Sequence, residues 1–253
     1  MKSAILITAR LKSTRLPRKV VKEIKGRSML CHMIDRLKLA KRPDEIVLIT
    51  SDLEEDMPLV DIAKAEGISY FRGHPDDVLR RMTDAAAEFG VDTIISCTAD
   101  NPFTDALHID KLIDFHLTHS HDYTKTEGLP WGTFTYCLSH PAMVRACEIK
   151  DMDDTEVWGG YFTETGIFKW GTMKVEDPRY RWPDLRLSVD FQEDFEIVSR
   201  IFDGLYEPGK VFSLEAIIAF CREHPELPEI NANVEQKPGL PIKVKANMGN
   251  VNG

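Results

Sequence analysis

The sequence predicts an α/β fold in which helices flank a mostly parallel sheet, and three observations support this prediction. Short apolar runs alternate with amphipathic segments over roughly the first 120 residues. The runs "AILIT", "IVLIT" and "TIISC" are mainly apolar and do not alternate with charged residues, as expected for strands buried on both faces of a sheet. Glycines that can end helices follow two of the amphipathic segments, at Gly67 and Gly90. Strands that alternate with helices imply right-handed crossovers and parallel pairing.

The elements of this region follow from local signals. Strands are expected at Ser3–Thr8, Glu45–Ser51, Ile68–Phe71 and Thr93–Thr98, where the chain is apolar. Helices are expected between and after them, at Ser28–Ala40, Glu54–Glu66, Asp76–Phe89 and Asp105–His116. Ser28 is a suitable N-cap for the first helix, because its hydroxyl can accept a hydrogen bond from an unpaired backbone N–H.

The middle of the chain has a different pattern. Residues 121–180 are rich in aromatic residues and glycine, which predicts antiparallel strands and loops added to the sheet, with a helix near Ser139–Ile149. Further helices are expected at Glu193–Phe202 and Ser213–Glu223. We therefore expect one domain over residues 1–224, in which residues 121–182 form a lobe for an acceptor or for dimer contacts. Residues 225–253 are expected to be an irregular tail that reaches a partner subunit of a homodimer.

Composition excludes several classes of protein. The 253 residues have a formal net charge of −9, which argues against a general nucleic-acid binder. No apolar run approaches the roughly 18 residues that a membrane span needs, and the N-terminus lacks the cleavage site of a signal peptide. The 5 cysteines are scattered and never form CxxC, which argues against a disulfide scaffold or a structural zinc site. These features favour the cytoplasm.

A cluster of cations follows the first expected strand, in "ARLKSTRLPRK". Residues 10–27 contain eight Lys or Arg and one acid. Residues 9–19 contain no glycine, so this is not a loop whose backbone wraps a phosphate. Side chains must then do the binding, and we assign Arg10, Arg15 and Lys19 to phosphate groups, with Ser13 as a hydroxyl donor. Arg18, Lys22, Lys25 and Arg27 are taken as solvated.

Two aspartates are candidates for a metal site. Open parallel sheets bind ligands beyond the carboxyl ends of their strands. Segments 9–19, 72–77 and 99–104 lie at such ends and are expected to converge on one cleft. Asp100 follows one buried strand, and Asp190 follows the strand-like run "RLSV". Paired carboxylates that face a triphosphate suit Mg²⁺. The alternatives are that Asp100 is a turn residue before proline and that Asp190 is an acid at a helix N-terminus.

Four motifs in order resemble one known family. "ARLKSTRLPRK", "FRGHPDDVLRRM", "TADNPF" and "RLSVDFQEDF" resemble segments of the cytidylyltransferases that activate acidic sugars such as Kdo and sialic acid, and most of all the spore-coat-polysaccharide F type. The resemblance covers residues 1–118 and 183–203 well and residues 121–180 poorly. It implies a Rossmann-like nucleotidyltransferase fold of the glycosyltransferase-A kind. It also implies transfer of CMP from CTP to an acceptor hydroxyl with release of pyrophosphate.

The resemblance also implies roles for residues of this chain. Cytosine would be recognised near Ile7–Ala9 and by the Arg72–Asp77 segment, with Thr98 beside the nucleotide. Asp100 and Asp190 would hold Mg²⁺, while Arg10, Arg15 and Lys19 would bind the outer phosphates. The acceptor is expected to be an acidic sugar used for a surface polysaccharide, with a sugar phosphate or phosphonate as the alternative.

Candidates for the acceptor's charge lie in the less similar lobe. They are Lys125, Arg179, Arg181 and Arg186, although the arginines could simply pair with the acidic run 151–156 or with Asp184.

Three weaker signals remain open. The "DMD" at residues 151–153 matches a glycosyltransferase pattern, although the acidic run 151–156 is more typical of a solvated loop. His116, His119 and His121 are spaced as metal ligands could be, although histidines at a helix end are usually solvated. A non-catalytic nucleotide-binding or assembly module is the alternative from another class of function.

Overall fold

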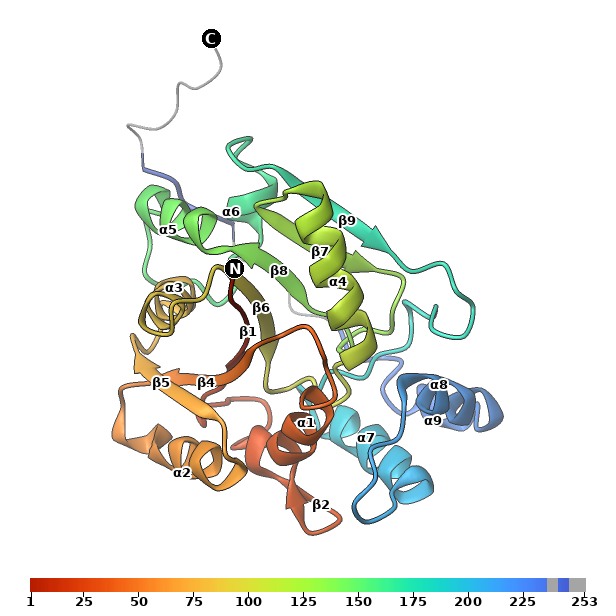
Figure 1. Ribbon diagram of the computed structural model, residues 1–253. Helices are drawn as coiled ribbons and strands as arrows, with labels where there is room; N and C mark the ends of the chain where they lie inside the picture. Colours follow the sequence, from red (N-terminus) through yellow and green to blue (C-terminus); the bar gives the residue numbers. More distant parts are fainter. Residues whose placement is uncertain (236–240, 246–253) are drawn as a thin grey trace.

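The computed structural model describes residues 1–235 and 241–245 of the chain. Within them, seven strands form one sheet in the order β5-β4-β1-β6-β8-β7-β9 (Figure 1). In chain order these strands are β1 (Ser3–Thr8), β4 (Glu45–Ser51), β5 (Ser69–Gly73), β6 (Thr93–Thr98), β7 (Tyr123–Glu127), β8 (Tyr136–Ser139) and β9 (Trp170–Lys174). A separate small ribbon consists of β2 (Glu23–Ile24) and β3 (Arg27–Ser28).

Helices cover both faces of this sheet. They are α1 (Met29–Leu37), α2 (Met57–Glu66), α3 (Val78–Glu88), α4 (Ala106–His119), α5 (His140–Ile149), α6 (Gly160–Thr163), α7 (Gln192–Leu205), α8 (Leu214–Glu223) and α9 (Glu226–Glu229). Side chains alternate between the two faces along a strand. Ala4 and Leu6 of β1 therefore join the core under α3 and α5, whereas Ile5 and Ile7 join the core under α1, α2 and α4.

Capping residues fix where several helices begin. The side chains of Ser28, Asp77, Asp105, Ser139 and Ser213 each accept a hydrogen bond from a backbone N–H in the first turn of the helix that follows. Such a cap typically contributes about 1 kcal/mol. At the other end of α2, the chain leaves the helix at Gly67 with a φ of 67°, a conformation that glycine adopts without steric cost.

A third core lies beside one end of the sheet, where α7 and α8 pack against the start of α1 (Figure 1). It joins Met29 of α1 to Ile197 and Ile201 of α7 and to Ile217 of α8, all of them fully buried. Leu187 and Val189 belong to the same core. Their segment runs next to the loop after β6, because the Val189 N–H donates to the Asp100 carbonyl at 2.8 Å. This packing brings Asp190 to the end of the sheet.

The predicted fold class is confirmed, and the added strands differ from the prediction in one respect. β1 pairs in parallel with both β4 and β6, and β4 pairs in parallel with β5. β8 is antiparallel to β6 and to β7, as expected for the added lobe. β9, however, is parallel to β7, because α5, the loop after it and α6 carry the chain back before β9 begins.

The segment expected to be an irregular tail contains α9 and a short contact with this chain's own α5 region. Lys150 forms an isolated antiparallel bridge with Val244, and Ile242 packs against the core under α5. Residues 236–240 and 246–253 of this segment lie outside the described residues. Its contact with a partner subunit stays a prediction. Helices of the length and apolarity that a bilayer crossing demands do not occur in the described part of the chain.

Candidate active site

A cleft of about 330 Å³ opens at the carboxyl ends of β1 and β6. The loop after β1 and the loop after β6 leave the sheet side by side, because the Ala99 N–H donates to the Thr8 carbonyl at 3.0 Å. Parallel strands end at the same edge of a sheet, so the side chains of both loops face one space. The predicted site residues that line it are Ala9, Arg10, Ser13, Arg15, Lys19, Thr98, Asp100 and Asp190.

Lys19 lies at the centre of this cleft, between the two predicted metal ligands. Its Nζ is 2.9 Å from Oδ2 of Asp100 and 2.9 Å from Oδ1 of Asp190. Burial alone would lower the pKa of Lys19, but the two carboxylates outweigh it and hold that pKa above its usual value. The two aspartates, 90 positions apart in the sequence, therefore converge on a single cation.

Asp190 is surrounded by cations. Besides Lys19, it contacts Nη2 of Arg15 through Oδ1 at 2.8 Å and Nη2 of Arg186 through Oδ2 at 3.0 Å. Burial would raise the pKa of this carboxyl, yet Lys19, Arg15 and Arg186 lower it below its usual value. Asp190 is therefore ionised at neutral pH and held in a fixed position.

A buried network behind Asp190 holds it in place. Arg186 pairs through Nε with Oδ1 of Asp194 at 2.8 Å, and Asp194 is fully buried. Oδ2 of Asp194 accepts the backbone N–H groups of Asp190 and Phe191, both at 2.9 Å. The Asn231 side chain donates to Oδ1 of Asp194 at 2.8 Å. Arg186, expected to face the acceptor, instead supports the metal-ligand candidate from behind.

Two further arginines face the cleft from the side of α3. Arg10 pairs with Glu156 at 3.2 Å and with Asp76 at 3.7 Å. Arg81 lines the same cavity and is almost fully buried, and its Nη1 donates to the carbonyls of His74 and Pro75. Burial, with the nearby charge of Arg10, lowers the pKa of Arg81 to about 10. A desolvated guanidinium at the cleft is a strong potential partner for an anion.

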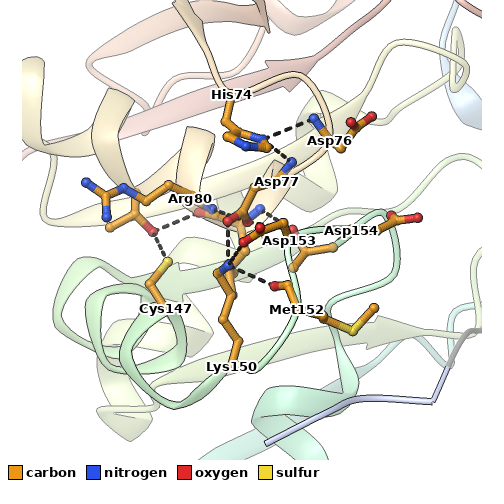
Figure 2. Close-up of polar contacts among 12 residues, drawn as sticks. His74, Asp76, Asp77, Arg80, Cys147, Lys150, Met152, Asp153 and Asp154 are labelled. Atoms are coloured by element: carbon orange, nitrogen blue, oxygen red, sulfur yellow. Dashed lines mark hydrogen bonds and ion pairs between the residues drawn. The ribbon is translucent and has the colours of Figure 1, made fainter. Parts of the chain in front are cut away.

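The far wall of the cleft is carried by the segment after α5, and Figure 2 shows how it is held. The Lys150 Nζ lies 2.5 Å from Oδ2 of Asp77, and both side chains are buried. The Lys150 Nζ also donates to the Met152 carbonyl at 2.9 Å. The Thr155 hydroxyl donates to Oδ1 of Asp77 at 2.9 Å. The segment expected to be a solvated acidic loop is therefore fixed to the N-terminus of α3, and it places Glu156 on the cavity wall.

Residues 241–245 bind to the base of the same segment. The Asp151 N–H donates to the Lys243 carbonyl at 2.8 Å, and the Lys245 N–H donates to the Ile149 carbonyl at 2.9 Å. The Tyr161 hydroxyl donates to the Lys243 carbonyl at 3.1 Å. The wall that carries Glu156 is thus tied on one side to α3 and on the other to residues 241–245.

The residues at Lys19 fit a divalent cation. The carboxylates of Asp100 and Asp190 both contact the Lys19 ammonium. A metal cation could occupy the position of that ammonium. Within residues 1–235 and 241–245, no group of three or more His, Cys, Asp or Glu side chains is arranged to hold a metal. Two carboxylates that leave the other positions to phosphate and water match the usual surroundings of Mg²⁺.

Arg72, which the sequence placed in this site, does not line the cavity in the structure. Its Nε donates to the Ser51 carbonyl at 3.3 Å and its Nη2 to the Asp52 carbonyl at 2.6 Å. It therefore holds the segment after β4 against β5. Its role in nucleotide binding stays a prediction.

Three residues that line the cleft carry polar or aromatic side chains and come from outside the predicted segments. These are Arg81, Glu156 and Trp158. The available signal for Arg81 was its helical spacing, because it lies three residues after Val78 and four before Ala85 and so shares a helix face with these apolar residues.

The other cations expected to face an acceptor pair with nearby acids. Lys125 contacts Glu127 at 2.7 Å. Arg179 contacts Asp177 at 2.7 Å and Arg181 contacts Glu176 at 3.7 Å, so their partners are acids other than those of the 151–156 run.

The histidine cluster also has internal partners. His116 is buried, which differs from the expectation of a solvated histidine. Its Nδ1 contacts the Thr124 hydroxyl at 2.9 Å.

Comparison with known proteins identifies similar chains. Residues 4–217 match a family model described as cytidylyltransferase. The spore coat polysaccharide biosynthesis protein SpsF of Bacillus subtilis is 28% identical over 223 residues, which cover 86% of this chain and 93% of that protein. A 3-deoxy-manno-octulosonate cytidylyltransferase of Geotalea daltonii is 25% identical over 251 residues, covering 96% of this chain and 89% of the relative. A solved cytidylyltransferase structure from Leptospira borgpetersenii superposes with a TM-score of 0.82 at 25% identity, covering 94% of this chain and 99% of that one.

Proposed function

The chain belongs to the cytidylyltransferase family, and from this membership we propose that it transfers CMP from CTP to a hydroxyl of an acidic sugar and releases pyrophosphate, with Mg²⁺ as its metal. It is a CTP-dependent nucleotidyltransferase of the type that activates acidic sugars. The observation that carries the proposal is the convergence of Asp100 and Asp190 on Lys19.

The cations of the first loop bind the triphosphate in this proposal. A nucleoside triphosphate brings several negative charges, so Lys19 and Arg15 can exchange their contacts with Asp190 for contacts with phosphate oxygens. Arg10 would likewise exchange its ion pairs with Glu156 and Asp76 for contacts with phosphate oxygens. These groups stabilise the charge that develops on the departing pyrophosphate, and the chemistry is mainly positioning and electrostatics.

Asp100 and Asp190 would hold the metal once Lys19 turns to the phosphates. When bound there, Mg²⁺ supplies charge neutralisation at the α-phosphate and favours ionisation of the attacking hydroxyl. Asp190 is suited to this role because Arg186 and the Asp194 network fix its position independently of Lys19. Asp100 is oriented by the Thr98 hydroxyl, which donates to its Oδ1 at 2.6 Å.

The base and the acceptor would occupy the two ends of the cleft. We place cytosine beside the backbone of Ala9 and the side chain of Thr98, at the ends of β1 and β6. The acceptor would enter on the side of Glu156 and Trp158, where a ring face and polar groups are available. Arg81 is the buried cation on that side that could meet the acceptor's carboxylate.

A pyrophosphate-release assay tests the reaction. The enzyme receives CTP, Mg²⁺ and one acceptor from a panel of Kdo-like, sialic-acid-like, neutral and phosphorylated sugars. We expect release with an acidic sugar. We expect Asp100→Ala and Asp190→Ala each to lower the rate by about 10³ or more. Asp203→Ala is a matched control, because Asp203 is an exposed acid that pairs with Lys25. Tight CTP binding without release from any acceptor would instead favour a nucleotide-binding module.

The assignment of the outer phosphates has its own test. Arg15→Ala and Lys19→Ala should weaken the binding of CTP more than that of CMP, since CMP lacks those phosphates. Isothermal titration calorimetry with both nucleotides measures the difference. Equal losses for CTP and CMP would place these two cations elsewhere in the site.

Assembly, location and pathway are also part of the proposal. We expect a homodimer in the cytoplasm that supplies a CMP-sugar for polysaccharide synthesis, as the name of the Bacillus subtilis relative suggests. Analytical ultracentrifugation of the full chain tests the dimer, and a monomer at micromolar concentration would contradict it.

A further inference from the structure

A second cavity, of about 530 Å³, lies between α1 and the segment that joins α7 to α8. None of its lining residues lines the first cleft. Its walls include Arg36 of α1 and Phe202 of α7. They also include Tyr206, which directly follows α7, and Phe212 of the joining segment. The proposed cytidylyltransferase reaction assigns no role to this space.

Arg36 lies in this cavity without a polar partner. The residue is 4% exposed. Among residues 1–235 and 241–245, its guanidinium makes no hydrogen bond and no ion pair, and its contacts are the faces of Phe103 at 5.6 Å and Phe212 at 5.1 Å from the ring centroids. Burial lowers the pKa of Arg36 to about 10, with Asp105 acting in the opposite direction. A buried charge without a hydrogen-bonding partner is costly, so the site favours an incoming anion.

The other cations that line this cavity are already paired. Arg27 contacts both Asp35 at 2.9 Å and Glu66 at 3.0 Å. Lys38 contacts Glu66 at 3.4 Å. Lys210 contacts Glu207, just outside the lining, at 2.6 Å. In the described part of the chain, Arg36 is thus the lining cation without an acidic contact, and its guanidinium remains available for an anion.

The rest of the wall next to Arg36 is aromatic. The rings of Phe202 and Phe212 lie 5.1 Å apart in an edge-to-face arrangement, and His32 lies 4.4 Å from Phe202. The His32 Nε2 contacts the Ile24 carbonyl, and burial lowers the pKa of His32, so this ring adds no charge at neutral pH. Aromatic walls favour a ligand with a ring or another apolar body.

We propose that this second cavity binds a small organic carboxylate, whose carboxylate meets the Arg36 guanidinium and whose apolar body lies against Phe202 and Phe212. A guanidinium presents two parallel N–H groups that match the two oxygens of a carboxylate. A carboxylate brings one negative charge to the one lining cation that lacks an acidic contact, whereas a phosphate monoester would bring more charge than this cation neutralises.

Calorimetric titration of the full chain with benzoate tests this proposal. The titration is run with saturating CTP present, so that the cations of the first cleft are occupied. We expect saturable binding of benzoate with a dissociation constant below about 10 mM. Benzamide, which has the same shape without the charge, should bind at least about tenfold more weakly. Inorganic phosphate should compete poorly.

Variants locate the binding to Arg36. Arg36→Met keeps an unbranched, apolar side-chain stem and removes the guanidinium charge, and we expect it to weaken the binding of benzoate by at least about tenfold. The matched control is Arg200→Met, since Arg200 is an exposed arginine that pairs with Glu196. Arg36→Met should keep its affinity for CTP, which shows that the variant is folded.

Four results would overturn the proposal. They are no saturable binding by the unmodified chain, equal binding of benzoate and benzamide, equal affinity in Arg36→Met and the unmodified chain, and displacement by phosphate as effective as by benzoate. The first, second and fourth use the unmodified chain alone, so the test does not depend on the stability of any variant.

Discussion

Replacing Lys19 with methionine should increase the affinity of the nucleotide-free protein for a divalent cation. The Lys19 ammonium stands between Asp100 and Asp190, 2.9 Å from each, and so competes with a metal for the same two carboxylates. Lys19→Met keeps an unbranched side chain of nearly the same length and removes the charge. The carboxylates then face each other without the cation that separates them.

The size of the effect follows from the local charges. The ion-pair cluster around Asp190 is neutral, with three acids and three bases: Asp100, Asp190, Asp194, Lys19, Arg15 and Arg186. Loss of Lys19 leaves one net negative charge. The Coulomb interaction energy between one unit charge and a divalent ion about 4 Å away is about 8 kcal/mol at an effective dielectric constant of about 20. Water at the partly exposed Asp100 and the ability of Lys19 to swing aside reduce this several-fold, so we expect at least about tenfold tighter binding, or about 1.4 kcal/mol.

Titration with Mn²⁺, followed by electron paramagnetic resonance of the free ion, measures this affinity without nucleotide. Lys22→Met is the matched control, because Lys22 belongs to the same stretch but lies over the ring of Phe195, at 4.8 Å from its centroid. With CTP present the order should reverse, since Lys19 then serves the phosphates. Equal Mn²⁺ affinity in Lys19→Met and the unmodified chain would refute the competition between lysine and metal.

Three further predictions concern stability. Lys150→Met leaves the buried carboxylate of Asp77 without its ion pair and should lower the free energy of unfolding by about 3–5 kcal/mol in urea denaturation; a change below about 1 kcal/mol would contradict the pairing. Burial lowers the pKa of His116 to about 4, so the unfolded chain binds more protons than the folded one between pH 4 and the ordinary pKa of histidine, about 6.5. Stability should therefore fall on acidification through that range by up to about 1.4 kcal/mol per pH unit, and His116→Asn should lack this part of the slope; equal slopes would show that His116 is not buried in its neutral form. At Gly132, where φ is 91°, an added Cβ would lie 2.4 Å from the backbone nitrogen of Ser188. Gly132→Ala should therefore lower the melting temperature by several degrees. An unchanged melting temperature would contradict this close approach.

The parallel half of the sheet was predictable because its signals are local. Strands β1, β4 and β6 have the predicted bounds, since each is a continuous apolar run. The parallel pairing of β7 with β9 was not predictable. Nothing in the short strand Trp170–Lys174 distinguishes the two directions, which are set by the path of the chain through α5 and α6.

The site was predictable in the segments that directly follow strands of the parallel half, and not in α3 or in the segment after α5. Asp100 lies in the loop after β6, and Arg15 and Lys19 lie in the segment after β1, and a parallel sheet brings the carboxyl ends of both strands to one edge. Arg81 is buried in α3 through bonds to the carbonyls of His74 and Pro75, which depend on how the preceding loop folds. Glu156 reaches the cleft because buried contacts between other residues hold its segment, and an acidic run shows none of that.

The attachment of residues 241–245 to the end of α5 has a consequence for the order of folding. The Lys245 side chain donates to the Glu148 carbonyl, 97 positions earlier in the chain. During synthesis, the sheet edge that holds Lys19 and Asp100 can form long before residues 241–245 leave the ribosome. The wall with Glu156 can acquire its second anchor only after them. A growing chain would therefore hold the phosphate side of the cleft first and complete the opposite side last.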